Sequence, residues 1–230
     1  MKICGLQKLT LLDFPDLTSC TVFTGGCNFR CPFCHNAALV TRDFTELEMD
    51  EEEILAFLKK RRGLLDGVCV TGGEPLLQPD LAEFLKKVRE LGFQIKLDTN
   101  GSFPDRLKKL VRNGLADYVA MDVKCGPESY GDVMGIPGYD ASAVEESIDF
   151  LLTGAVPYEF RTTLVKGLNT PENIVSAAKR IRGADKYFLQ QFVDSGDLIG
   201  SGYEAFSRQE MESFLGLVRQ YVKNAEIRGV

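Results

Sequence analysis

The 230-residue chain has one histidine, no tryptophan and no long apolar stretch. No apolar run approaches the ~20 residues that a membrane-spanning helix needs, so we expect no membrane span. Residues 1–5 lack the apolar core of a signal peptide, and we expect a cytoplasmic protein. The net charge of −6 gives no electrostatic footprint for nucleic acid or an anionic membrane.

The cysteines are the most informative residues that are present. There are seven, an odd number, which favours a reducing compartment over a disulfide framework. Three of them, Cys27, Cys31 and Cys34, form a C-x-x-x-C-x-x-C run. Three thiolates on one loop can hold three irons of a [4Fe–4S] cluster, which leaves the fourth iron without a protein ligand and open to chemistry.

Four other interpretations of this run exist. Cys31 and Cys34 alone form a C-x-x-C thiol–disulfide motif, and with His35 they form the C-x-x-C-H pattern of haem attachment. Haem attachment requires export, which the N-terminus does not support. A Cys₃His zinc site would use Cys34 and His35 as adjacent ligands, which strains a tetrahedral geometry. Three unpaired buried cysteines are the remaining possibility.

Short β-rich runs alternate with amphipathic stretches along most of the chain. This alternation predicts a parallel sheet with helices outside it. Six strands are too few for a closed eight-stranded barrel. The expected class is therefore α/β, either a partial (β/α)6 TIM-like barrel with parallel strands or a doubly wound sheet. Strands are predicted at 18–24, 67–71, 93–98, 118–123, 158–165 and 187–192, and helices at 50–62, 79–91, 104–113, 141–152, 171–181 and 207–221.

The expected organisation is one domain over residues 1–230. Residues 1–17 are predicted to add an extra strand pair before the core. Residues 18–192 form the barrel core, and residues 193–230 add a C-terminal helix and tail. The Gly- and Pro-rich stretch 125–139 is predicted to be a long loop, which is often functional at the mouth of a site.

Unusual polar residues follow or end the predicted strands, where a parallel barrel places its chemistry. Each has an ordinary alternative role, such as a tight turn or a helix cap. Consecutive glycines would let a ligand approach the backbone, arginine or lysine would bind a carboxylate, and aspartates would accept from ribose hydroxyls or bind a cation. A ligand with an amine, a carboxylate and a ribose, beside an open iron, is S-adenosylmethionine (SAM). The strand-end residues that we expect to bind this ligand are Gly72, Gly73, Glu74, Asp98, Thr99, Asp122, Lys124 and Arg161.

At this point the sequence resembles the radical SAM superfamily. The signature C-x-x-x-C-x-aromatic-C is met by the three cysteines with Phe33, and a Gly-Gly-Glu motif follows at Gly72. Within the superfamily it is similar to the glycyl-radical-enzyme activases, above all to the activating proteins of anaerobic ribonucleoside-triphosphate reductase. The narrower resemblance rests on residues 12–15, 34–36, 98–101, 122–124 and 189–192.

The resemblance implies a role for each matched residue. Cys27, Cys31 and Cys34 would ligate the [4Fe–4S] cluster, and Phe33 would lie near the adenine. Gly72, Gly73 and Glu74 would hold the methionine amino group. Lys124 and Arg161 would serve the carboxylate or the ribose. Asp98, Thr99 and Asp122 match positions that bind a monovalent cation in the pyruvate formate-lyase activase.

The implied activity is reductive cleavage of SAM to a 5′-deoxyadenosyl radical that removes hydrogen from a glycine of anaerobic ribonucleotide reductase. Flavodoxin or ferredoxin would supply the electron. One alternative is a small-molecule radical SAM enzyme such as 7-carboxy-7-deazaguanine synthase, because residues 70–78 suit that family too. An alternative of another class is a non-catalytic iron–sulfur or zinc module that carries electrons or senses redox state.

Overall fold

The computed structural model describes residues 1–41 and 47–229, and these residues form two compact units. The first unit contains Met1–Asn28, Ala38–Thr99 and Phe103–Val119. The second contains Phe29–Ala37, Asn100–Ser102 and Ala120–Val230. None of the helices in the described residues has the length and apolar character of a membrane-spanning helix.

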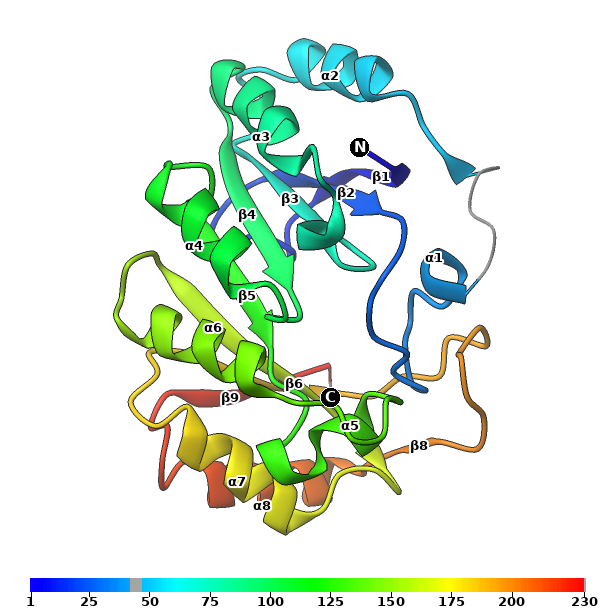
Figure 1. Cartoon of the computed structure of the whole chain (residues 1–230), viewed down its shortest axis with the longest axis vertical. Helices are drawn as coiled ribbons and strands as arrows, with labels where there is room; N and C mark the ends of the chain where they lie inside the picture. Colours follow the sequence, from blue (N-terminus) through cyan, green and yellow to red (C-terminus); the bar gives the residue numbers. More distant parts are fainter. Residues whose placement is uncertain (42–46, 230) are drawn as a thin grey trace. The chain divides into compact units, whose positions relative to one another are not determined.

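The first unit is a sheet with helices packed beside it (Figure 1). β1 (Ile3–Thr10) pairs antiparallel with β2 (Ser19–Thr24), whereas β2, β3 (Gly67–Gly72) and β4 (Gln94–Thr99) pair in parallel. Its helical elements are α1 (Ala38–Thr41), α2 (Glu51–Lys60), η2 (Pro75–Leu77), α3 (Leu81–Glu90) and α4 (Pro104–Arg112). β5 (Tyr118–Asp122) begins in this unit and continues into the second.

The pattern of apolar residues explains why the strands and helices of the first unit form and pack together. The central strands carry fully buried apolar side chains such as Val68, Val70 and Leu97, as expected for parallel strands covered on both faces. Helix α3 buries Leu81, Phe84, Leu85 and Val88, a spacing that follows the 3.6-residue period.

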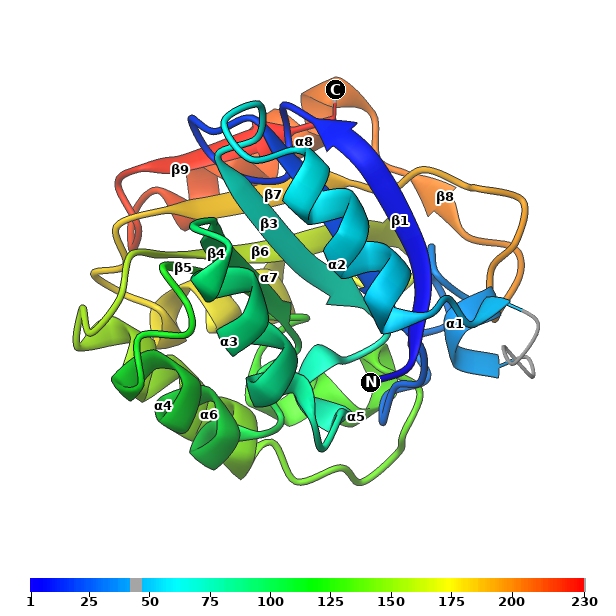
Figure 2. The same ribbon diagram turned by 90° about the horizontal axis from the view of Figure 1, so that it is seen from above.

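The second unit repeats the β–α pattern. β6 (Tyr158–Lys166), β7 (Tyr187–Gln191) and β9 (Ala225–Arg228) pair in parallel, and β8 (Glu204–Ala205) pairs antiparallel with β6. The helical elements are η3 (Pro127–Ser129), α5 (Tyr130–Val133), α6 (Ser142–Leu152), α7 (Pro171–Arg180) and α8 (Arg208–Val218). Helices α7 and α8 pack against each other and lie side by side in Figure 1, and Figure 2 shows the same elements from above. A capping box of Ser207 and Glu210 begins α8, within the predicted helix 207–221.

Two sequence predictions need correction. Residues 1–17 contain one strand, β1, rather than a strand pair. The chain turns after Thr10 because its hydroxyl oxygen accepts from the amides of Leu12 and Asp13, and Asp16 adopts a left-handed conformation with φ 63°.

Residues 125–139 are not a plain loop, because they contain η3 and α5. Their apolar residues Cys125, Tyr130, Val133 and Met134 are buried. Burial of these side chains stabilises the two short helices despite the glycines and prolines around them. The short elements α1, β8 and β9 were not predicted, and the single-domain organisation stays a prediction.

Candidate functional site

The cysteine run begins directly after β2, where the backbone is held firmly within the first unit. The Gly26 amide donates to the Leu39 carbonyl at 2.8 Å, and the Gly26 carbonyl accepts from the Glu74 amide at 2.9 Å. The Gln78 side chain donates to the Gly25 carbonyl at 2.7 Å. These bonds fix the point from which the chain enters Cys27.

The two glycines of the Gly-Gly-Glu motif allow the end of β3 to approach this point. A Cβ on Gly73 would lie 2.0 Å from the Gly26 carbonyl oxygen, and one on Gly72 would lie 2.3 Å from the Thr24 nitrogen. Gly72 also has φ 120°, which side-chain-bearing residues rarely adopt. The glycines therefore have a packing role that the sequence did not reveal. Their contact with a ligand stays a prediction.

Glu74 is fully buried, and its carboxyl group joins two strand ends. Its Oε1 accepts from the Leu76 amide at 2.9 Å and from the Thr99 hydroxyl at 2.8 Å. The structure thus brings together Glu74 and Thr99, two residues that the sequence singled out separately.

We predict that Thr99→Val destabilises the protein, because one bond to the buried carboxyl group of Glu74 is lost. The expected loss in free energy of unfolding is about 1–3 kcal/mol. Thr24→Val is the matched control, since its buried hydroxyl donates to the Thr71 carbonyl at 3.0 Å and its loss should cost less. Urea unfolding of both variants measures the difference. An equal or smaller loss in Thr99→Val would contradict the role given to this bond.

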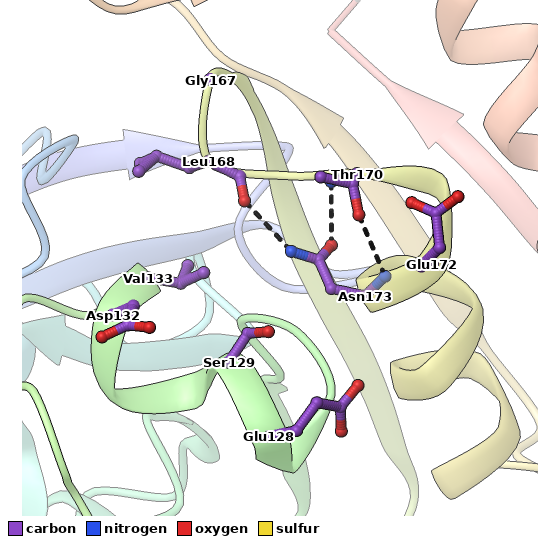
Figure 3. A pocket seen from close by; sticks show the side chains of 9 residues that line it. All are labelled: Glu128, Ser129, Asp132, Val133, Gly167, Leu168, Thr170, Glu172 and Asn173. Carbon is purple, nitrogen blue, oxygen red and sulfur yellow. Dashed lines mark hydrogen bonds between the residues drawn. The ribbon is translucent and has the colours of Figure 1, made fainter.

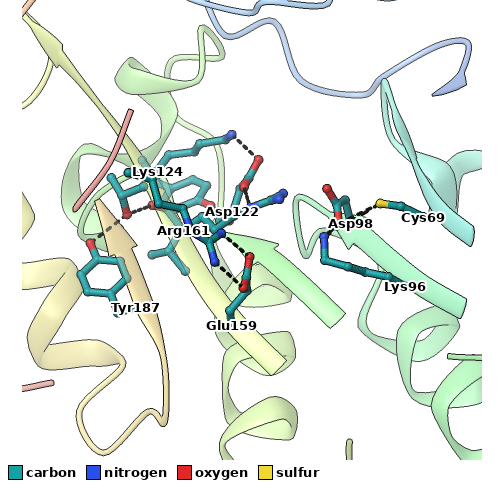
Figure 4. Close-up of polar contacts among 12 residues, drawn as sticks. Cys69, Lys96, Asp98, Asp122, Lys124, Glu159, Arg161 and Tyr187 are labelled. Atoms are coloured by element: carbon teal, nitrogen blue, oxygen red, sulfur yellow. Dashed lines mark hydrogen bonds and ion pairs between the residues drawn. The ribbon is translucent and has the colours of Figure 1, made fainter. Parts of the chain in front are cut away.

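Asp98 already has a cationic partner in the first unit. Its carboxylate forms an ion pair with Lys96, a nearly buried lysine of β4, and the Cys69 thiol lies 3.6 Å away (Figure 4). A lysine two residues before Asp98 on the same strand was the sequence signal for this pair, and it was missed.

The second unit contains Phe33 and the other two cysteines of the run. The Cys34 amide donates to the Cys31 carbonyl at 3.0 Å, which closes a turn. Burial raises the pKa of the Cys31 thiol to about 11, although the Lys124 ammonium acts in the opposite direction. Burial also raises the pKa of the Cys34 thiol.

Residues outside the cysteine run support it within the second unit. The Arg30 amide donates to the Met134 carbonyl at 3.2 Å, and the Gly200 amide donates to the Pro32 carbonyl at 2.7 Å. Gly135 approaches so closely that a Cβ would lie 2.4 Å from the Arg30 carbonyl oxygen. The segment 125–139, predicted to be a long loop, therefore packs against the cysteine run.

Asp122, Lys124 and Arg161 form a charged trio in the same unit (Figure 4). The Asp122 carboxylate lies 3.0 Å from Lys124 Nζ and 3.0 Å from Arg161 Nε. Burial alone would raise the pKa of Asp122, but the two cations hold it at about 2. Burial would lower the pKa of Lys124, yet the neighbouring Asp122 and Cys31 raise it. The Lys124 ammonium lies 5.9 Å from the centre of the Phe33 ring.

The low pKa of Asp122 predicts a pH dependence of stability. Its pKa falls from 3.8 to about 2 on folding, so the stabilisation is present above pH 3.8 and is lost as the pH falls through about 2. We expect Asp122→Asn to lower the free energy of unfolding at pH 7, with a deficit that shrinks below about pH 4. Urea unfolding between pH 3 and 7 tests this, and a deficit that stays constant over that range would contradict it.

His35 stacks on Phe192, with ring centroids 5.7 Å apart and an interplanar angle of 25°. Burial lowers its pKa, although a hydrogen bond with the Val193 backbone opposes that shift. The observed role of His35 is to join the cysteine run to the segment after β7.

The donor chemistry fits the implied iron–sulfur cluster. All three cysteines of the run are thiols outside any disulfide. In residues 1–41 and 47–229, no three His, Cys, Asp or Glu side chains gather as ligands of one metal ion. A cubane does not require such convergence, because each thiolate binds a different iron. The monovalent cation at Asp98, Thr99 and Asp122 stays a prediction.

A cavity of about 390 Å³ lies in the second unit, and its lining residues include none of the predicted site residues (Figure 3). Glu128, Asp132 and Glu172 line it together with the start of α7. The Asn173 side chain at its wall donates to the Leu168 carbonyl and accepts from the Thr170 amide. These polar atoms cap α7, so this cavity gives no evidence of a ligand site.

Comparison with known proteins extends these observations. A family model described as Radical SAM superfamily matches residues 21–181. A Methanocaldococcus jannaschii protein, provisionally named a glycyl-radical enzyme activating enzyme, is 31% identical over 99% of this chain and 96% of its own length. The 7-carboxy-7-deazaguanine synthase of Methanopyrus kandleri is 37% identical over 43% of this chain and 46% of the synthase.

A solved structure supports the fold. A domain of a pyruvate-formate lyase-activating enzyme from Bacteroides vulgatus superposes with a TM-score of 0.58 at 22% identity, over 71% of this chain and 99% of that domain. This likeness and the parallel strand pairing confirm the predicted fold class, an α/β partial TIM-like barrel.

Proposed function

Because this chain belongs to the radical SAM superfamily, we propose that it cleaves SAM reductively and uses the 5′-deoxyadenosyl radical to generate a glycyl radical on anaerobic ribonucleoside-triphosphate reductase. The observation that carries the activase assignment is the likeness to the M. jannaschii protein, which spans nearly the whole of both chains. The residues 12–15 and 189–192 support the reductase as the target.

Cys27, Cys31 and Cys34 provide three thiolates for a [4Fe–4S] cluster. When bound, that cluster supplies the single electron that breaks the S–C5′ bond of SAM. Burial of Cys31 and the contacts of Arg30 and Pro32 keep this part of the chain ordered and limit the access of water. We propose flavodoxin or ferredoxin as the electron donor, and a reducing cytoplasm suits the free thiols.

Other residues would bind and orient SAM. Gly72, Gly73 and Glu74 would receive the methionine amino group through their backbone, since the Glu74 carboxyl group is already bonded to Leu76 and Thr99. Lys124 and Arg161 would bind the carboxylate or the ribose, and Phe33 would contact the adenine. The trio of Asp122, Lys124 and Arg161 supports this role, because it contains two cations and one anion.

The reaction balances with one electron from the donor. SAM yields methionine and the 5′-deoxyadenosyl radical, which takes one hydrogen atom from the glycine Cα. The products are 5′-deoxyadenosine, methionine and the glycyl radical of the partner.

The test is anaerobic incubation of the reconstituted protein with SAM, a reductant and the reductase. We expect a glycyl radical by electron paramagnetic resonance and 5′-deoxyadenosine in comparable amount. The same mixture with Cys31→Ala is the control and should give neither. Abundant 5′-deoxyadenosine without a protein radical would contradict the assigned partner but leave SAM cleavage standing.

A small-molecule reaction is the second candidate, favoured by the likeness to the M. kandleri synthase. Turnover of a small pterin-like substrate, with no radical on the reductase, would favour this function instead. The shorter span of that likeness, 43% of the chain, places it second.

A further inference from the structure

Lys124 places a positive charge against the cysteine run within the second unit. Its ammonium lies 5.9 Å from the centre of the Phe33 ring, and Phe33 directly precedes Cys34. The Lys124 side chain is only 12% exposed. Water therefore screens its charge poorly, and its field should extend over the neighbouring thiols.

Asp122 fixes the position of this charge. Its carboxylate lies 3.0 Å from Lys124 Nζ and 3.0 Å from Arg161 Nε. Two cations and one anion leave the trio with a net charge of one positive unit at neutral pH, because all three groups remain ionised there. The Lys124 backbone is held as well, since its carbonyl accepts from the Asn169 side chain at 3.4 Å.

A largely buried ammonium in contact with the Phe33 ring favours negative charge on the adjacent Cys34 or on a group bound there.

We propose that Lys124, positioned by Asp122, raises the reduction potential of a [4Fe–4S] cluster bound through Cys31 and Cys34. This role rests on the proposed function, because it requires that cluster. Reduction adds one electron and no proton to the cluster, so its negative charge increases by one unit. A nearby positive charge stabilises the reduced form, and net charge is among the factors that set cluster potentials. Lys124 is a positioning residue in this sense, whatever it also contributes to SAM binding.

The experiment measures the midpoint potential of the reconstituted full chain without SAM, by redox titration followed by electron paramagnetic resonance. Omitting SAM removes any effect of Lys124 on cofactor binding. At the potential where half of the wild-type clusters are reduced, we expect about a tenth or fewer of the Lys124→Met clusters to be reduced, a shift of about 59 mV or more. Lys124→Arg keeps the charge and should titrate close to wild type.

The sign of each shift separates an electrostatic role from a structural one. Asp122→Asn removes the negative charge of the trio and should shift the potential in the positive direction. Arg161→Gln removes the other positive charge of the trio and should shift the potential in the negative direction. Lys166→Met is the matched control on β6, because its ammonium pairs with Glu210 at 3.0 Å, and it should leave the potential unchanged.

Iron and sulfide are determined first for each variant, and only variants with wild-type content are titrated. If Lys124→Met loses the cluster, Arg161→Gln and Asp122→Asn still test the proposal through their opposite signs. An unchanged potential in all three charge variants, or shifts of the same sign in Arg161→Gln and Asp122→Asn, would overturn it. A wild-type chain that binds no [4Fe–4S] cluster would instead overturn the proposed function.

Discussion

Replacing Cys31 with alanine is expected to abolish cofactor cleavage and to remove most of the iron that the wild-type chain binds on anaerobic reconstitution. A cubane that loses one of three protein thiolates retains two, and the iron left without a ligand is prone to dissociate. Replacing a residue that only hydrogen-bonds a metal ligand already costs about 10–100-fold in metal affinity or activity. Loss of a ligand itself should therefore cost more than about a hundredfold.

The loss in Cys31→Ala should be chemical rather than structural. Cys31 is buried at 8% exposure, but alanine fills most of the same volume and keeps the backbone bond from the Cys34 amide. We therefore expect the variant to unfold at nearly the wild-type urea concentration. Iron and sulfide analysis, the visible absorption of the cluster and the yield of 5′-deoxyadenosine measure the effect.

Cys4→Ala is the matched control. Cys4 lies in β1, is also nearly buried, and is also a free thiol. It lies outside the cysteine run and should retain four irons per chain, the complement of one cubane. Equal iron loss in both variants, or full cleavage activity in Cys31→Ala, would contradict the assignment of the three cysteines.

The positions of the main strands and helices could be predicted from the sequence because local signals mark them. Helices α3 and α4 are followed by Gly92 and Gly114, which adopt φ 91° and 65°. Such left-handed glycines end helices at little cost. The capping box before α8 marks its first residue in the same way.

The sequence could not show which distant residues meet. Tyr130 and Tyr139 lie in a Gly- and Pro-rich stretch that predicts a loop, but both rings pack edge-on against Phe29, with centroids 6.4 and 5.3 Å away. That contact joins segments about 100 residues apart. Local composition therefore predicted a loop where packing of these side chains holds two short helices.

The candidate site shows the same limit. The motifs identified the cysteines and the Gly-Gly-Glu residues, but not the bond between Glu74 and Thr99 or the pairing of Asp98 with Lys96. Glu74 follows β3 and Thr99 ends β4, so whether they meet depends on strand register. Lys96 and Asp98 lie two residues apart on β4 and therefore on one face of the sheet, a local signal that was overlooked. β9 was missed for a different reason: its residues alternate between apolar and charged, but a run of four residues is too short to give a clear periodic signal.

Gly73→Ala is expected to destabilise the protein and to disturb the entry to the cysteine run. The added Cβ would lie 2.0 Å from the Gly26 carbonyl oxygen and 2.6 Å from its carbonyl carbon. Both are backbone atoms, which cannot rotate away as a flexible side chain can. Overpacking of this kind costs about 1–3 kcal/mol and sometimes more, and we expect the upper part of that range.

Relief of the clash requires the backbone of Gly26 to move, and Cys27 follows directly. The bond from the Glu74 amide to the Gly26 carbonyl, at 2.9 Å, would lengthen or break. Gly73→Ala should therefore reduce both the free energy of unfolding and the iron bound per chain. Urea unfolding of the metal-free chain and iron analysis after reconstitution separate the two effects.

Gly216→Ala is the matched control, because a Cβ at that position of α8 would meet no atom within 4 Å. Alanine is the better helix former, so this variant should be more stable than wild type by about 0.5–1 kcal/mol and should bind iron normally. If the Gly73→Ala variant had the same stability and iron content as the Gly216→Ala variant, the end of β3 would not hold the start of the cysteine run. The Gly-Gly pair would then be required for ligand approach alone, as the sequence suggested.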